Sequence, residues 1–146
     1  MNEAIGITKA CKSLGIPFVC SFTTETDGSL PSGQLLKDAV EQVDRETDCY
    51  PSYFTINCSH PSHFLPVIEA NVGQSWLGRL RGLNGNASKK SHGELDNCTE
   101  LDFGDPVEFG QLNARLKELN PAFNEFGGCC GTDIRHVTEV FKILTA

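Results

Sequence analysis

The sequence predicts an α/β domain in which four strand–helix units follow one leading helix and build a parallel sheet. Short apolar runs rich in β-branched and aromatic residues alternate with longer segments of helical period. At 146 residues the chain is one domain by length, about half of the roughly 250 residues of a (βα)8 barrel. Such alternation gives parallel strands with right-handed crossovers, either in an open doubly wound sheet or in part of a (βα)8 barrel.

The leading helix and the first unit occupy the first 44 residues. Residues 3–14 have apolar side chains at helical spacing, and Gly15 is expected to end that helix. The apolar run at 16–22, IPFVCSF, predicts a strand buried on both faces, as in parallel sheets. After a loop at 23–33, the segment 34–44 places its leucines and valines on one helical stripe.

The middle of the chain repeats this pattern. Residues 51–58, PSYFTINC, predict a second strand, and the segment from about 62 to 80 predicts a second helix. The stretch 81–88, RGLNGNAS, is a weaker strand candidate because Gly and Asn are poor strand formers. Its place in the alternation nevertheless favours a third strand.

A third helix is expected at 105–120. Asp105 opens it, Pro106 suits its first position, and Glu108 has the spacing of the return arm of a capping box. Pro121 then ends it.

The last unit contains the strand 122–130, AFNEFGGCC, and a helix at 132–144. Thr132 is the expected N-cap of that helix. The stripe expected to be buried consists of Val137, Val140, Phe141 and Leu144.

Charge and composition exclude several classes of protein. A net charge of -7 and a pI near 5.0 argue against a nucleic-acid-binding protein, which concentrates Lys and Arg. No apolar run approaches the roughly 18 residues that span a bilayer, and the N-terminal segment is too charged for a signal peptide. We therefore expect a cytoplasmic protein with no membrane partner, whose seven cysteines are reduced.

Cysteines at two strand ends form the most informative feature. Cys58 ends the second strand, and Cys129 and Cys130 lie within the glycine-rich segment 126–133, FGGCCGTD. Alternate strands of a barrel point toward the same layer, so the three sulfurs are expected to converge, with glycines allowing the sharp backbone turns. Three thiolates suit zinc and leave one tetrahedral corner open for a substrate.

Other interpretations of the cysteines remain open. A buried cysteine commonly acts as a small hydrophobic residue, and the adjacent pair Cys129–Cys130 also suits a vicinal disulfide or a redox pair. The structural interpretation is kept for Cys11, Cys20, Cys49 and Cys98.

Some polar side chains near the strand ends are weaker candidates. Asn57 and Asn86 follow strands, where an amide can orient a substrate, although it more often satisfies loop backbone. The loop histidines His60 and His63 are minor candidates for metal ligands. His92 and His136 are interpreted as structural.

Five segments together resemble the homocysteine S-methyltransferase family, whose barrel holds a catalytic zinc. They are SFTTETDGSLPSG at 21–33, NCSHP at 57–61, NASKKSHGELD at 86–96, ELDFGDP at 100–106 and GGCCGTDIRH at 127–136. The resemblance implies that residues 1–146 are a partial homocysteine-binding barrel domain, the C-terminal half that contains strands five to eight of the family fold.

The resemblance also implies a reaction. Cys58, Cys129 and Cys130 would be the zinc ligands, and the thiol of homocysteine would take the fourth corner. The methyl donor would be a sulfonium compound, S-methylmethionine or S-adenosylmethionine, and the product methionine. Because the family's first four units do not match here, we expect self-association or a separate N-terminal half as partner. A truncated half-barrel that binds zinc or a partner without turnover is the alternative.

Overall fold

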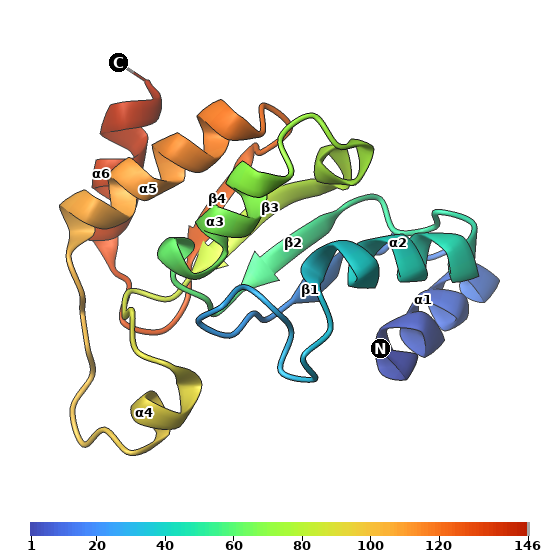
Figure 1. Ribbon diagram of the computed structural model, residues 1–146, viewed down its shortest axis with the longest axis horizontal. Helices are drawn as coiled ribbons and strands as arrows, with labels where there is room; N and C mark the ends of the chain where they lie inside the picture. Colours follow the sequence, from blue (N-terminus) through green and yellow to red (C-terminus); the bar gives the residue numbers. More distant parts are fainter. Residues whose placement is uncertain (146) are drawn as a thin grey trace.

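Four parallel strands lie side by side in chain order, β1-β2-β3-β4, in the computed structural model (Figure 1), which describes residues 1–145. The residues Phe22, Ile56, Leu83 and Phe126 pair in one row across the sheet. The strands are β1 (Cys20–Phe22), β2 (Phe54–Asn57), β3 (Leu80–Gly85) and β4 (Glu125–Gly128). The predicted parallel α/β architecture is thus confirmed. Within the described residues the sheet does not close into a barrel, and β1 and β4 are its edges.

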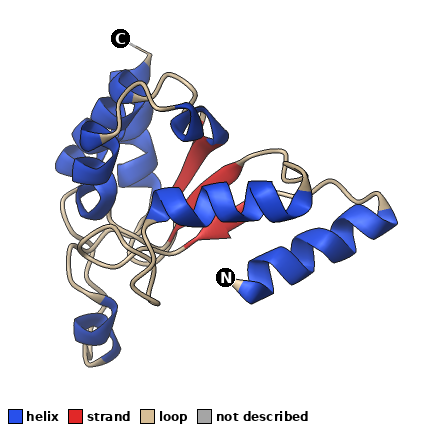
Figure 2. Cartoon of the chain, turned by 45° about the vertical axis from the view of Figure 1, so that its right-hand side comes forward, coloured by secondary structure: helices blue, strands red, loops and turns tan. Residues whose placement is uncertain are grey.

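Helices connect the strands and pack next to one another along the chain. Contacts join α1 to α2, α3 to α5, and α5 to α6, while α4 is set apart at one end of the molecule (Figure 2). The helices are α1 (Asn2–Leu14), α2 (Leu36–Thr47), α3 (Pro61–Ala70), the 3-10 helix η1 (Ser75–Arg79), α4 (His92–Asp96), α5 (Pro106–Leu119) and α6 (Ile134–Leu144). Within residues 1–145, no helix is long and apolar enough to cross a membrane.

The ends of α1 and α5 follow from local chemistry that the sequence predicts. Gly15 takes left-handed backbone angles after α1, as expected for a glycine C-cap. The Asp105 carboxylate accepts hydrogen bonds from the backbone of Val107 and Glu108 at the start of α5. The predicted return arm is wrong, because the Glu108 carboxylate forms an ion pair with Lys89 instead.

The helix predicted at 62–80 is two helices. The segment α3 ends at Ala70, and the chain turns through Gly73 at a φ of +84° before η1 begins. Only glycine adopts that conformation readily, so a continuous helix is not possible there.

The strands are covered by helices on one face only, so the expectation of two buried faces is wrong for β1. Ser21 in β1 is exposed between buried neighbours. Its hydroxyl donates to Asn57 in β2 and accepts from Thr55, and farther along the sheet Asn84 donates to Glu125. This side of the sheet is therefore a hydrogen-bonded polar face. The other face joins the core, whose fully buried residues include Phe54, Ile56, Phe64, Leu80, Leu83 and Phe123.

The last helix differs from prediction at its start and on its surface. Asp133, not Thr132, is the N-cap of α6, and it forms a capping box with His136. The Thr132 hydroxyl donates to the Cys129 carbonyl instead. Of the stripe predicted to be buried, only Val140 is buried; Val137 and Phe141 are exposed, at 47% and 66%.

Candidate metal centre

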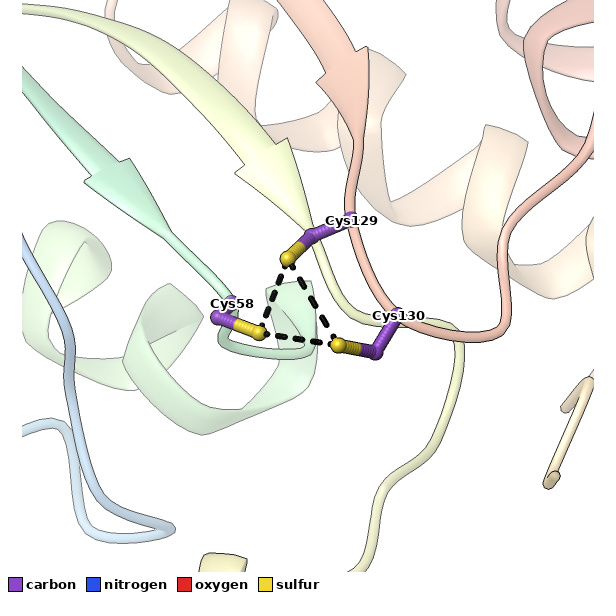
Figure 3. Close-up of side chains that lie close together, drawn as sticks. All are labelled: Cys58, Cys129 and Cys130. Atoms are coloured by element: carbon purple, nitrogen blue, oxygen red, sulfur yellow. Dashed lines mark hydrogen bonds between the residues drawn. The ribbon is translucent and has the colours of Figure 1, made fainter. Parts of the chain in front are cut away.

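Three cysteine sulfurs meet at the C-terminal ends of β2 and β4 (Figure 3). The Cys58 sulfur lies 2.9 Å from that of Cys129 and 3.5 Å from that of Cys130, and the latter two are 3.8 Å apart. An ion with tetrahedral geometry and metal–sulfur bonds of about 2.3 Å holds its sulfurs about 3.8 Å apart. The cluster is within about 1 Å of that arrangement, so these residues fit a soft divalent cation such as zinc.

The intervening strand β3 positions the cysteines of its two neighbours. The backbone N–H of Cys58 donates to the carbonyl of Asn84 at 2.8 Å, and that of Cys129 donates to Gly85 at 2.7 Å. Successive carbonyls of one strand thus fix the two cysteines from opposite sides. The strands β2 and β4 are not neighbours, and their cysteines meet because both are attached to the end of β3.

Two glycines allow the chain to pass this closely. Gly131 has a φ of +75°, and a Cβ there would overlap the Asp102 carbonyl oxygen. A Cβ on Gly128 would overlap the Thr132 hydroxyl. The glycine-rich surroundings of the cysteine pair are therefore a steric requirement, as well as a source of backbone freedom.

The thiols of Cys58 and Cys129 do not lose their protons equally. Burial, reinforced by hydrogen bonds to Cys129 and Cys130, raises the pKa of Cys58 to about 12. At Cys129 burial opposes ionisation, but hydrogen bonds with Cys58 and Cys130 outweigh it and lower the pKa of that thiol. Of these two thiols, Cys129 therefore loses its proton more readily than Cys58. A cation bound by three thiolates must displace the Cys58 proton.

A cavity of about 450 Å³ opens onto the sulfurs. Cys58 and Cys130 line it together with Asn86, His92, residues 95 and 96 at the end of α4, and residues 98–102 in the loop after it. Its size suits an amino acid or a somewhat larger small molecule. A ligand in this space has direct access to a metal held by the cysteines.

A comparison with protein families matches residues 1–144 to the family described as Homocysteine S-methyltransferase. The chain belongs to this family. No curated protein and no solved structure matches the chain significantly. Membership of the homocysteine S-methyltransferase family supports a methyltransferase-like activity on small molecules, and the three-cysteine cluster is the candidate metal site within it.

The two asparagines considered for substrate contact have different surroundings in this chain. The Asn57 amide accepts from Ser21 and donates to Thr23, so β1 and its loop engage both of its polar atoms. Asn86 is 4% exposed and lines the cavity. Its Oδ1 accepts from the Ser88 backbone, while no hydrogen bond engages its Nδ2 within residues 1–145.

The loop histidines lie outside the cluster of ligand atoms. His60 caps α3 through its Nδ1, and burial, with smaller effects of His63 and Lys89, lowers its pKa to about 4. The His63 Nε2 lies 2.9 Å from the Lys89 carbonyl. His136 is fully buried and bonds the carbonyl of Phe103, which agrees with its structural interpretation.

The remaining cysteines also lie outside the cluster. All seven cysteines of residues 1–145 are free thiols, and the separation of 3.8 Å between the sulfurs of Cys129 and Cys130 is that of unbonded atoms. Cys20 is buried in β1, whereas Cys98 is exposed at the cavity wall.

The short helix α4 was not predicted, although it forms part of the cavity wall. A signal for it exists in SHGE at 91–94, which has the Ser-x-x-Glu spacing of a capping box. Both hydrogen bonds of that box are present between Ser91 and Glu94. His92, at the first position of this helix, contacts the Cys58 carbonyl at 3.1 Å.

Proposed function

We propose that this chain holds the zinc centre of a homocysteine S-methyltransferase and transfers a methyl group from a sulfonium donor to homocysteine, giving methionine. The observation that carries the proposal is the convergence of three sulfurs beside an open cavity in a chain of this family. In the proposal, residues 1–146 form a partial barrel domain that contains strands five to eight of the family fold.

The proposed zinc ligands are Cys58, Cys129 and Cys130. When bound, zinc lowers the pKa of a coordinated substrate thiol, so that the homocysteine sulfur attacks as a thiolate near neutral pH. Two of these three residues, Cys58 and Cys130, line the cavity, so a substrate sulfur in the cavity would lie beside the cluster.

Polar groups of the cavity would orient the two substrates. The Nδ2 group of Asn86 can donate a hydrogen bond to an acceptor on a ligand in the cavity, whereas Asn57 would act indirectly by holding the end of β2. Asp96 and Glu100 line the same cavity, and their negative charge favours a cationic sulfonium over a neutral methyl donor. This supports S-methylmethionine or S-adenosylmethionine as the donor class.

The proposed reaction is a direct displacement at the methyl carbon. The homocysteine sulfur forms a bond to that carbon while the carbon–sulfur bond of the sulfonium breaks and returns its electron pair to the donor sulfur. The thiol proton of homocysteine passes to solvent. The sulfonium charge is neutralised, and the two products are methionine and the demethylated donor.

A partner would complete the sheet. Eight strands close a barrel of this type, and residues 1–145 form four, with β1 and β4 as unpaired edges. The α6 face beside β4 exposes Ile134, Val137 and Phe141. Both features support self-association or assembly with a separate N-terminal half. They equally favour the second candidate function, a half-barrel that binds zinc or a partner without turnover.

Metal analysis tests the site itself. We expect one zinc ion per purified chain and its loss in Cys58→Ser. The matched control is Cys49→Ser, because Cys49 is also a free thiol but lies outside the cluster. Equal zinc contents in Cys58→Ser and in the wild type would show that the site is wrong.

Turnover tests the reaction and separates the two candidate functions. We expect methionine to form when the zinc-loaded chain receives homocysteine and either S-methylmethionine or S-adenosylmethionine, and the better donor identifies the cationic substrate. A chain that binds zinc but yields no methionine with either donor, alone or as its largest assembly, would support the non-catalytic candidate instead.

We also propose that the protein is located in the cytoplasm. The free thiols throughout residues 1–145 suit that reducing compartment.

A further inference from the structure

Cys58 departs from strand geometry at the point where its sulfur must reach the other two. Asn57 points to the polar face of the sheet, where it bonds Ser21, so an extended residue 58 would point to the helix-covered face. On β4, the same alternation aims Cys129 at the polar face, because Glu125 lies there. The two sulfurs meet because Cys58 has a φ of +53°, which breaks the alternation.

A left-handed conformation is unfavourable for cysteine, so neighbouring groups must hold it in place. The N–H of Cys58 bonds the Asn84 carbonyl and fixes the residue on its strand side. The carbonyl of Cys58 lies 3.1 Å from the Nε2 of His92. A carbonyl oxygen is only an acceptor, so this ring nitrogen donates. Among the described residues, no backbone or side-chain group other than His92 donates to that carbonyl.

His92 is itself held on two sides. It is the first residue of α4, directly after Ser91, which begins the capping box of that helix. Its Nδ1 lies 3.4 Å from the Glu25 carboxylate in the loop after β1. The ring thus links three loops, those after β1, β2 and β3, at the cavity wall.

We propose that His92 is the positioning residue of the metal centre, which holds the carbonyl of Cys58 and thereby keeps its sulfur directed at Cys129 and Cys130. The inference rests on the proposed function, since it assigns a residue to the same metal site. His92 contributes no ligand atom. It determines whether the first cysteine of the cluster points toward the metal or toward the helix-covered face.

The test compares two histidine-to-carbonyl hydrogen bonds. His92→Ala removes the bond to Cys58, and His63→Ala removes a bond of similar length to the Lys89 carbonyl. Zinc affinity is measured by competition with a chromophoric chelator, and cobalt(II) absorption reports the number and arrangement of thiolate ligands. We expect His92→Ala to weaken zinc about tenfold to a hundredfold, as loss of outer-shell partners does, and to alter the cobalt bands. His63→Ala should lower stability and leave both readouts unchanged.

A conservative variant separates the hydrogen bond from mere packing. The amide nitrogen of glutamine can occupy the place of a histidine Nε2, so His92→Gln should recover most of the zinc affinity and the wild-type cobalt spectrum. The proposal is overturned if His92→Ala binds zinc like the wild type, if His63→Ala weakens zinc to the same extent, or if His92→Gln is no better than His92→Ala.

A metal-free measurement keeps this inference distinct from the proposed function. If the wild type binds neither zinc nor cobalt, the proposed function fails, and hydrogen exchange at the Cys58 amide then tests His92 alone. That amide is bonded to Asn84 and should exchange faster in His92→Ala than in the wild type or His63→Ala. Equal exchange rates in all three proteins would overturn the positioning role without any reference to metal.

Discussion

Replacing Gly131 with alanine should disrupt the metal site, whereas the same replacement at a glycine of similar backbone conformation in open space should not. A left-handed conformation costs about 1–2 kcal/mol for a residue with a Cβ, and Gly131 has a φ of +75°. The new methyl group would also overlap the Asp102 carbonyl and lie 3.0 Å from the Ala87 Cβ. Forcing atoms into such a packed position adds about 1–3 kcal/mol. The expected loss in free energy of unfolding is therefore about 3.5 kcal/mol, in the middle of the summed range.

Gly33 provides the control for this experiment. Its φ is +77°, nearly that of Gly131, but a Cβ there has no heavy atom within 4 Å. Gly33→Ala should therefore show only the backbone penalty of about 1–2 kcal/mol and normal zinc binding. Urea unfolding of the metal-free proteins and zinc competition measure the two effects. Equal unfolding energies and equal zinc affinities for the two variants would refute the steric role assigned to Gly131.

Three further predictions concern protons and surfaces. Burial, with a smaller effect of Asp44, raises the pKa of Cys20 to about 11, so the folded chain keeps this proton while the unfolded chain loses it above its ordinary pKa of about 8.5. Stability should then fall as pH rises from 9 to 11, by on the order of 2 kcal/mol more than in Cys20→Ala, measured by urea unfolding; parallel pH profiles would contradict this. Because the pKa of Cys58 is raised to about 12, zinc must displace the proton of this thiol, and the apparent zinc affinity should rise about tenfold per pH unit for this proton alone. Calorimetry in buffers of different ionisation enthalpy measures the proton release. A zinc affinity that does not depend on pH would exclude this proton displacement. Phe141→Lys should reduce self-association in sedimentation without changing the unfolding temperature, because Phe141 is 66% exposed; an unchanged sedimentation profile would exclude α6 from the contact.

The order of elements and several helix ends could be predicted because they depend on neighbouring residues. Gly15 ends α1 and Asp105 begins α5 through hydrogen bonds within a few positions of each residue. Strand–helix alternation likewise gave the parallel sheet. The family follows from motifs that extend over residues 21–136, and the match to residues 1–144 agrees with it.

The failed predictions concern contacts that an element makes, or lacks, with other parts of the chain. The apolar stripe of α6 has the period of a buried face, yet Val137 and Phe141 are exposed, because nothing in residues 1–145 covers them. The run around β1 is apolar enough for a strand with two buried faces, but Ser21 belongs to a polar face that only the neighbouring strand reveals. Thr132 and Asp133 are both good N-cap residues. Asp133 caps α6 because the Thr132 hydroxyl donates its hydrogen bond to the Cys129 carbonyl.

The convergence of the cysteines shows the same division between local and nonlocal information. The sequence could place Cys58 and Cys129 at the ends of two strands, but residue alternation aims their side chains at opposite faces of the sheet. The backbone of Cys58 resolves this conflict with a φ of +53°, which no residue next to it in sequence requires. The groups that hold it come from Asn84, at the end of β3, and from His92, seven residues beyond that strand. A histidine that looks structural in the sequence therefore becomes informative only when the strained backbone of a distant cysteine is seen beside it.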